Sequence, residues 1–169
     1  LYMKHIIDAF TATAHQYPDR IAIQDCESQL TYRELDECSN IIAHQLQSPC
    51  VLIMLPRRVS FLISTFATLK AGSTYVGVNT DYPADRIRYI AEDSGAGVII
   101  TTTSIWNEKK TELECLIGSG LSLILIDQIN DKVFNASNCG DNCARWLLEM
   151  GREKDVVINL RHLMDFGDG

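Results

Sequence analysis

Long hydrophobic runs are missing from this sequence. The longest apolar stretches, residues 50–56 and 121–127, are far shorter than the ~20 residues that a membrane-spanning helix needs. The first residues also lack the charged-then-apolar pattern of a secretory signal. We therefore expect no membrane partner and a cytosolic location.

Positive charge is scarce and dispersed. The chain has 15 Lys and Arg residues against 22 Asp and Glu residues, which gives a formal net charge of −7. Its longest basic clusters are the pairs Arg57-Arg58 and Lys109-Lys110. Because binding to nucleic acid requires a concentrated positive surface, nucleic acid is not an expected partner.

Paired cysteine motifs and histidine motifs are absent as well. The six cysteines are scattered singly, which fits reduced thiols better than a disulfide framework. Cys139 and Cys143 are spaced so that they could share a metal with a histidine, but no second ligand pair accompanies them. No Ser or Cys motif surrounds the histidines, and solvent-facing helix positions account for His5, His15 and His44. We expect no metal site and no catalytic residue.

The composition is that of an ordinary globular protein. Of the 169 residues, 46% are apolar and 22% are charged, which suits one domain or a part of a larger one. The chain begins at Leu1 rather than at a start methionine, and residues 167–169 follow no helix or strand pattern. We expect an excerpt from a longer polypeptide.

Two helices are predicted near the start of the chain. Apolar residues recur at helical spacing within residues 4–17, and Pro18 ends that pattern because its ring cannot continue the hydrogen-bond ladder. The second helix lies within residues 30–46, where Thr31 and Glu34 have the spacing of a reciprocal amino-terminal cap.

Strand and helix patterns then alternate along the chain. The predicted strands are residues 50–56, 74–79, 97–102 and 121–127, and the predicted helices are residues 59–72, 81–96 and 107–120. Two of the strands are apolar on both faces, and strands that alternate with helices form parallel sheets. The predicted fold class is therefore α/β, with a mainly parallel βαβ sheet covered by helices on either side.

Three segments are predicted along the chain. The α/β core covers residues 1–127, and the polar, turn-rich residues 128–142 form a linker. Residues 143–169 make a short irregular or β tail, too small for a core of its own. A single strand at residues 156–160 needs an edge from elsewhere. The tail either folds against the sheet or lies across the surface of another domain, and its low apolar content favours the second placement.

Several single residues receive structural interpretations. Lys70 suits the negative end of a helix dipole, and Tyr75, Tyr82 and Tyr89 are interpreted as packing residues. Residues 117–121 contain a glycine pair reminiscent of a phosphate-binding loop. The lysine that follows in such loops is missing, so we interpret the segment as a plain turn.

Residues 30–46 and 69–101 resemble two early core motifs of the adenylation domains of nonribosomal peptide synthetases, members of the adenylate-forming superfamily. In residues 69–101 the helix end, the strand, the Tyr-Pro turn and the next helix match in order. The resemblance covers about residues 5–127 and implies the fold of one subdomain of the large lobe. Where the family has a Val-Pro-Leu-Asp run, residues 76–79 are Val-Gly-Val-Asn.

Residues 139–155 resemble late motifs of the same family. Asp141 takes the place of the aspartate whose carboxylate accepts hydrogen bonds from the ribose of ATP. Arg152 belongs to a Gly-Arg pair before the interdomain hinge, where Lys154 takes the hinge position, and Arg161 replaces a glycine. The resemblance implies that Asp141 and Arg152 are vestigial ATP-ribose positions; a turn aspartate and a surface arginine are the alternative interpretations.

The motifs that the family places between these early and late segments are missing from this sequence. They include the Ser/Thr/Gly-rich triphosphate loop, the adenine and magnesium motifs and the amino-acid pocket, and the subdomain with the catalytic lysine is missing too. Adenylation brings a carboxylate against a phosphate, so catalysis depends on preorganised positive charge and N–H donors. The resemblance with these gaps implies a truncated pseudo-adenylation domain that binds neither ATP nor magnesium.

Three functions remain open for such a chain. The first is an inactive spacer or docking platform between condensation and peptidyl-carrier domains of a synthetase for secondary metabolite biosynthesis. The second is an incomplete portion of an active ligase, which would form an aminoacyl-AMP from ATP and an amino acid and then a thioester on a carrier. The third is an independent small nucleotide-binding module.

Overall fold

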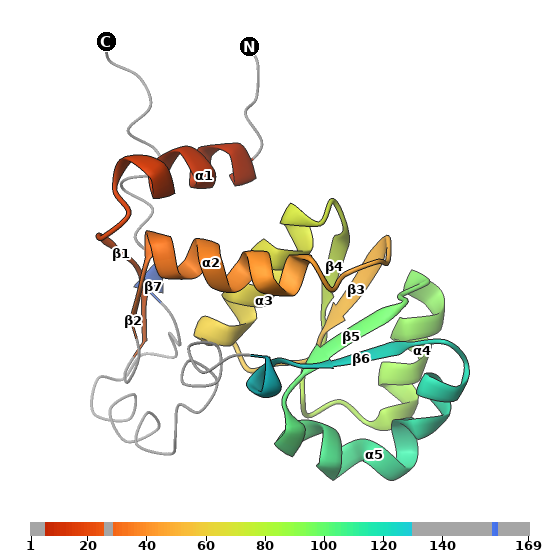
Figure 1. Ribbon diagram of the computed structural model, residues 1–169. Coiled ribbons are helices and arrows are strands. Elements are labelled where there is room, and N and C mark those ends of the chain that lie inside the picture. Colours follow the sequence, from red (N-terminus) through yellow and green to blue (C-terminus); the bar gives the residue numbers. More distant parts are fainter. Residues whose placement is uncertain (1–5, 26–28, 130–156, 159–169) are drawn as a thin grey trace.

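The computed structural model describes residues 6–25, 29–129 and 157–158, which form two β-sheets and five α-helices (Figure 1). The helices are α1 (Ile6–Gln16), α2 (Tyr32–Ala43), α3 (Val59–Lys70), α4 (Ala84–Ser94), α5 (Thr103–Gly118) and the 3-10 helix η1 (Ile126–Gln128). The strands are β1 (Ile21–Gln24), β2 (Gln29–Thr31), β3 (Cys50–Ile53), β4 (Thr74–Gly77), β5 (Val98–Thr101), β6 (Ser122–Leu125) and β7 (Val157–Ile158).

The larger sheet is parallel throughout and has the strand order β4-β3-β5-β6. Its two central strands, β3 and β5, are buried at every residue, because helices cover both faces. Successive side chains of a strand point to opposite faces, so Val51 and Ile53 of β3 join one core cluster while Leu52 joins the other. The predicted mainly parallel α/β sheet is confirmed.

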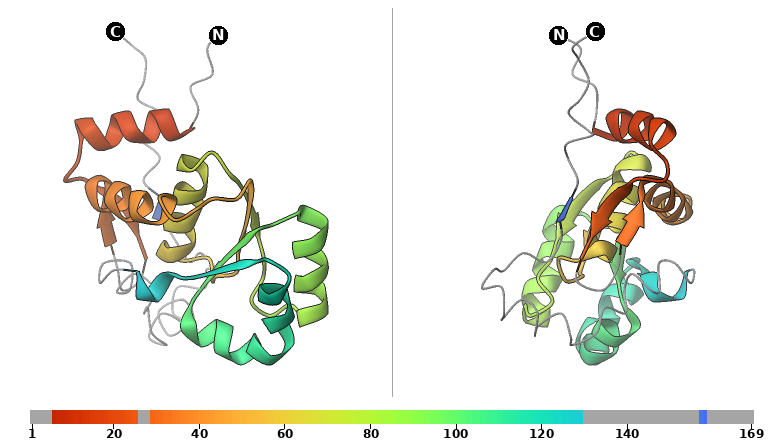
Figure 2. Two further views of the ribbon diagram at one scale, coloured as in Figure 1. Left: turned by 45° about the vertical axis from the view of Figure 1, so that its right-hand side comes forward. Right: turned by 90° about the vertical axis from the view of Figure 1, so that its left-hand side faces the viewer.

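Different helices cover the two faces of this sheet. One core cluster contains buried side chains of α1, α2 and α3, and the other contains buried side chains of α4 and α5. Figure 2 shows from two further directions that α4 and α5 lie away from α1 and α2. Burying each large aliphatic side chain in these layers contributes roughly 1.5–3 kcal/mol to folding.

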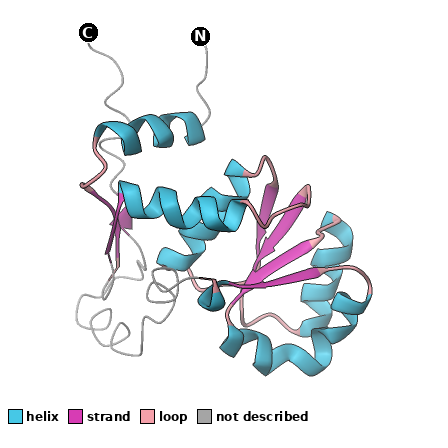
Figure 3. Ribbon diagram, in the orientation of Figure 1, coloured by secondary structure: helices cyan, strands magenta, loops and turns pink. Residues whose placement is uncertain are grey.

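The smaller sheet has the order β2-β1-β7 and is antiparallel (Figure 3). Strand β7 pairs with β1, with Ile158 opposite Ile23 and Val157 opposite Gln24. The expectation that the strand in the tail would need an edge from another domain is therefore wrong for Val157 and Ile158. The other residues of 143–169, and residues 130–142 of the linker, lie outside the described residues.

The first helices end and begin for the predicted reasons. Helix α1 ends at Gln16, two residues before Pro18, and Phe10 of α1 packs with a ring-centroid distance of 4.5 Å against Phe66 of α3. At α2, Thr31 accepts a hydrogen bond from the N–H of Glu34, and the Glu34 carboxylate accepts one from the N–H of Thr31. The predicted capping box is confirmed.

Helix α5 begins earlier than predicted, at Thr103 rather than at residue 107. The cause is a second amino-terminal cap, because Thr102 Oγ1 accepts a hydrogen bond from the N–H of Ile105 at 3.4 Å. The whole helix packs through Trp106, Leu113 and Leu116 into the core cluster that it shares with α4.

Candidate functional site

The candidate site lies at the carboxyl ends of β3 and β4. The chain leaves β3 for α3 on one face of the sheet, and it leaves β4 for α4 on the opposite face. Loops that diverge in this way open a crevice at the end of the strands, which is where ligands bind in open α/β sheets. This crevice holds a pocket of about 350 Å³.

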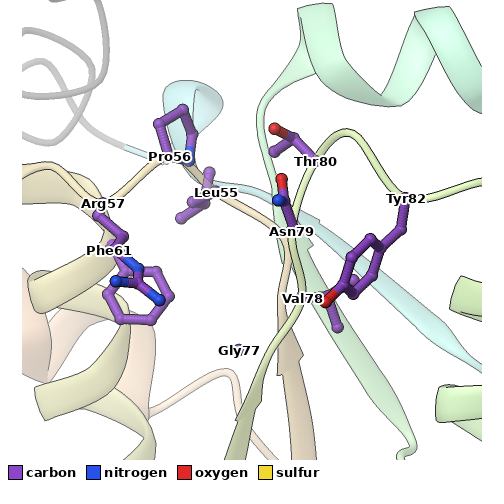
Figure 4. Close-up of a pocket in the computed structure, with 9 residues that line it drawn as sticks. All are labelled: Leu55, Pro56, Arg57, Phe61, Gly77, Val78, Asn79, Thr80 and Tyr82. Carbon is purple, nitrogen blue, oxygen red and sulfur yellow. The ribbon is translucent and has the colours of Figure 1, made fainter.

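Two walls face each other across the pocket, one from the β3–α3 segment and one from β4 and the loop that follows it (Figure 4). The lining residues are Leu55, Pro56, Arg57, Phe61, Gly77, Val78, Asn79, Thr80 and Tyr82. Leu55 and Val78 are each 3% exposed, so they anchor the walls in the core. At Gly77 a Cβ would lie 3.4 Å from the Phe61 ring, so the glycine leaves the space above that ring open.

The loop after β4 is held by hydrogen bonds. Asn79 Oδ1 accepts one from the N–H of Asp81 at 3.0 Å, and Lys109 of α5 donates one to the Tyr82 carbonyl at 3.0 Å. The N–H of Val78 also donates to the carbonyl of Ile53 on β3. The wall that carries Asn79, Thr80 and Tyr82 is therefore fixed relative to the sheet.

Among the described residues that line the pocket, Arg57 carries the one formal charge. Helix α3 begins two residues after Arg57, and its N-cap residue, Arg58, makes no side-chain capping hydrogen bond. A guanidinium and a helix amino terminus both favour an anion, while Asn79, Thr80 and Tyr82 supply neutral donors and acceptors. The pocket is thus suited to a polar ligand of small size, and no carboxylate is among its described lining residues.

The amino terminus of α5, at the end of the neighbouring strand β5, is already occupied. Both Asp127 carboxylate oxygens accept hydrogen bonds from the N–H of Thr103, at 3.0 and 3.1 Å. Gln128 adds a hydrogen bond to Thr103 Oγ1. A carboxylate of the chain itself therefore takes the position in which an external anion would bind.

The structure does not describe the residues that the sequence singled out for nucleotide or metal binding. Asp141, Arg152, Cys139 and Cys143 all lie outside the described residues. Within the described ranges, no three His, Cys, Asp or Glu side chains gather closely enough to hold a metal ion. Residues 117–121 form the predicted turn, since α5 ends at Gly118 and Gly120 has a φ of 106°.

The interpretation of the three tyrosines as packing residues is wrong. Tyr75 and Tyr82 are each 39% exposed, and Tyr89 is 56% exposed. Tyr75 lies on the outer strand β4 and meets Phe61 edge-on, while Tyr89 lies beside the guanidinium of Arg86. Tyr75 is exposed because β4 is an outer strand of the described sheet. The sequence alone did not predict which strand would be the outer one.

Lys70 lies in the last turn of α3, as its interpretation requires, and it has a further role. Its side chain is 9% exposed, and its Nζ donates to Asp36 Oδ1 at 2.6 Å and to Asn40 Oδ1 at 2.9 Å. It therefore joins α3 to α2 rather than acting only on the dipole of its own helix. Burial lowers the pKa of Lys70, and the hydrogen bond and charge of Asp36 oppose that shift.

The exposed histidine positions and the thiols agree with the sequence. His15 and His44 are exposed on the surface, as predicted. Cys38, Cys50 and Cys115 are not in disulfides. Sequence reasoning missed Arg57 and Tyr82 as pocket residues, whereas the departure from the family pattern at residues 76–79 had already drawn attention to Gly77 and Asn79.

None of the helices in the described part of the chain is both long and apolar enough to span a membrane.

A family model described as "AMP-binding enzyme" matches residues 10–158 of this chain. Among curated proteins, the chain is 33% identical over 142 residues to a plipastatin synthase of Bacillus subtilis strain 168, covering 79% of this chain and 5% of that protein. It is 26% identical over 177 residues to gramicidin S synthase 2 of Brevibacillus brevis, covering 96% of this chain and 4% of that protein. The chain therefore spans only a small part of these relatives.

Solved structures give the same fold. The chain superimposes on O-succinylbenzoate coenzyme A synthetase of Bacillus subtilis, solved in complex with AMP, with a TM-score of 0.60 and 25% identity, over 72% of this chain and 32% of that one. It superimposes on the anthranilate CoA ligase AuaEII, solved with anthranoyl-AMP, with a TM-score of 0.64 and 18% identity, over 79% of this chain and 28% of that one.

Proposed function

Because the chain belongs to the AMP-binding enzymes, and within them to the adenylation domains of nonribosomal peptide synthetases, we propose that it is a non-catalytic member of this family. It acts as a structural spacer or docking platform between the condensation and peptidyl-carrier domains of one synthetase. Its expected location is the cytosol. By itself it does not form an aminoacyl-AMP.

The charge of the pocket at the ends of β3 and β4 carries this proposal. Forming an aminoacyl-AMP brings a carboxylate against the α-phosphate of ATP, so the site must offset several negative charges at once. Arg57 is the one charged residue among the lining residues that the structure describes. The neighbouring amino terminus of α5 is taken by Asp127. This small amount of positive charge supports the proposal that the chain does not carry out the reaction by itself.

A spacer needs a packed fold rather than a reaction centre, and the packing of the described residues supports this role. Helices cover both faces of the parallel sheet, and β3 and β5 are buried throughout. In a multidomain synthetase, the distance between two folded domains sets the effective concentration of a tethered carrier domain at the domain with which it reacts. A flexible linker of the same length would spread that distance widely.

Asp141 and Arg152 enter the proposal as vestigial positions. The resemblance places them where the family contacts the ribose of ATP, and without the rest of a nucleotide pocket they hold no ATP. No magnesium or other cofactor is needed for a role as spacer.

A second candidate function is that of one portion of an active amino-acid-adenylating ligase. The alignment with gramicidin S synthase 2 favours it, because that alignment runs over 177 residues and 96% of the chain. An alignment of this length contains no insertion of domain size. Under this interpretation the catalytic motifs that the 169 residues lack belong to other parts of the synthetase. They have not been deleted between residues 127 and 141.

Amino-acid-dependent exchange of pyrophosphate into ATP separates the two candidates. The assay uses the complete synthetase that contains this chain, with every other adenylation domain inactivated and each amino acid tested in turn. The spacer proposal predicts no exchange above the level without amino acid, together with normal loading of the adjacent carrier when the other domains are restored. Exchange with any amino acid contradicts the spacer proposal and supports the second candidate.

A further inference from the structure

The outer edge of β4 lacks the features that keep sheet edges from pairing with other strands. Among the described residues, β4 has a neighbour on one side only, which is β3, and their register runs without a shift from Thr74 to Gly77. Natural edge strands are commonly protected by charged side chains, by proline or by a bulge. Residues 71–80 contain no charged residue and no proline. This edge of the sheet is therefore open to strand pairing.

The register of β4 fixes which of its backbone groups face outwards. The N–H groups of Thr74 and Val78 donate to the carbonyls of Pro49 and Ile53, on the side of β3. Alternate residues of a strand direct their N–H and C=O groups to the same side, so those of Tyr75 and Gly77 face the outer edge. Because position 77 is not a proline, each of these two residues offers a donor as well as an acceptor.

The spacing of these backbone groups is self-complementary. When two copies of β4 run antiparallel with Val76 opposite Val76, Tyr75 of each copy lies opposite Gly77 of the other. Opposite residues whose backbone groups face each other exchange both of their hydrogen bonds, so every outward-facing group of Tyr75 and Gly77 finds a partner. Each chain has a net charge of −7, but residues 71–80 are uncharged. Two copies therefore meet at this edge without like charges opposite each other.

The side chains at these positions fit the same register. Tyr75 meets the Phe61 ring edge-on at 6.5 Å, and a Cβ at Gly77 would lie 3.4 Å from the same ring, so both positions lie on the α3 face of the sheet. Gly77 and Phe61 line one open pocket (Figure 4). Tyr75 is 39% exposed, and opposite residues of an antiparallel pair share one face. Tyr75 of one copy therefore covers Gly77 of the other, and an aromatic ring over a glycine restores the packing that the glycine lacks.

We propose that the outer edge of β4 binds β4 of a second copy of this chain, antiparallel and about a two-fold axis beside Val76. The two parallel sheets become one continuous sheet, and Tyr75 of each copy packs on Gly77 and Phe61 of the other. The paired edge is short, since β4 has four residues, so the dimer belongs to the weak and transient class. This interaction is separate from the spacer role, and it does not depend on whether the chain adenylates an amino acid.

Sedimentation equilibrium of the 169-residue chain measures this association. We expect a monomer–dimer equilibrium with a dissociation constant on the order of 100 µM. Gly77→Pro removes a donor from the edge of each copy and should weaken the dimer at least about tenfold. Gly77→Ala keeps that donor and should change the dissociation constant by less than about threefold. Tyr75→Ala removes the ring that covers Gly77 and should weaken the dimer about fivefold.

Disulfide cross-linking tests the register. The two copies of Val76 form a pair whose backbone groups face away from each other, and the Cα atoms of such a pair lie about 4.5 Å apart, which a disulfide can bridge. Mild oxidation of Val76→Cys should therefore link two tryptic peptides of residues 71–86, which contain no native cysteine. Thr74→Cys is the matched control, because this register places the two copies of residue 74 about 13 Å apart.

A chain that stays monomeric up to about 1 mM would overturn the proposal, as would a Gly77→Pro chain that dimerises like the wild type. Equal cross-linking at residues 74 and 76 would overturn the two-fold register. Association that grows without limit would mean that β4 pairs with a different edge of the second copy, which also contradicts the proposal. Circular dichroism at micromolar concentration, where the chain is monomeric, shows whether each variant is folded. If Gly77→Pro does not fold, Tyr75→Ala decides, and an unweakened dimer of that variant would overturn the proposed contact.

Discussion

At the scale of single residues, the close approach of Gly97 to Ser48 makes the start of β5 intolerant of a side chain. A Cβ at Gly97 would lie 2.7 Å from Ser48 Oγ and 3.2 Å from Ser48 Cβ. Ser48 cannot simply turn away, because its Oγ donates to the carbonyl of Cys50 and accepts from the N–H of Gly97. The contact between Ser48 and Gly97 therefore holds the segment before β3 against the segment before β5.

Gly97→Ala should lower the free energy of unfolding by about 1–3 kcal/mol, the usual cost of forcing extra atoms into a packed site. Urea denaturation followed by circular dichroism measures it. Gly118→Ala is the matched control, since a Cβ there meets nothing within 4 Å and should change stability by less than about 0.5 kcal/mol. Equal effects of the two substitutions would show that the Ser48 contact is unimportant.

Lys70 makes a second residue-scale prediction. Lys70→Met removes the donor to Asp36 and Asn40, and it leaves a partly buried carboxylate without its cation. The free energy of unfolding should fall by about 2 kcal/mol. Lys109→Met is the control, because Lys109 makes an exposed hydrogen bond to the Tyr82 carbonyl and should cost less than about 0.5 kcal/mol.

The pH dependence of the same pair follows from the lowered pKa of Lys70. Near the ordinary value of 10.5, the unfolded state still binds the proton at pH values where the folded state has begun to lose it. The contribution of Lys70 to stability therefore increases with pH in the window below 10.5. The stability difference between wild type and Lys70→Met should grow from about pH 8 to about pH 10, and a difference that shrinks would contradict the assigned shift.

At the scale of elements, β4 is an edge strand of the parallel sheet among the described residues, and its register decides where proline is tolerated. The N–H groups of Thr74 and Val78 donate to carbonyls of Pro49 and Ile53. Since alternate residues of a strand face the neighbouring strand, the N–H of Val76 also faces β3 and the N–H of Gly77 faces the open edge. Edge positions of this kind accept proline.

Gly77→Pro, which restores the residue of the family pattern, should therefore change the free energy of unfolding by less than about 1 kcal/mol. Val76→Pro, one residue earlier, should cost about 3 kcal/mol because it removes a ladder hydrogen bond. Both are measured by denaturant unfolding. Equal costs for the two prolines would mean that β4 has another register or a partner on its outer edge.

Most elements of the α/β core were predictable because their signals are local. The capping box at Thr31 and Glu34 and the fully apolar strands β3 and β5 left clear patterns in the sequence. The pairing of β7 with β1 could not be predicted in the same way, because two residues carry no periodicity and the contact joins distant parts of the chain. The early start of α5 at Thr103 was missed because a single Thr cap gives a weak signal.

At the scale of the whole molecule, the sequence predicted the family far better than it predicted a site. The motif in residues 69–101 identified the fold, since helix, strand and turn signals occur there in a fixed order. The pocket around Arg57 and Tyr82 depends on how the loops after β3 and β4 diverge, which is a property of sheet order. Asp141 and Arg152 stay predictions because they lie outside the described residues.

The packing of the parallel sheet also explains how this α/β core can stay folded without catalysing a reaction. Helices on both faces bury β3 and β5, and the described residues of the two core clusters pack against one another without a ligand. Under the spacer proposal, this core keeps the condensation and peptidyl-carrier domains at a set distance even if it binds no nucleotide.

Isothermal titration of the 169-residue chain with ATP and magnesium tests this account most directly. A complete adenylation domain from a plipastatin synthase, titrated under identical conditions, serves as the positive control. We predict no heat of binding above dilution for this chain, because its pocket presents one guanidinium and its α5 terminus is occupied by Asp127. A dissociation constant in the micromolar range would contradict the account.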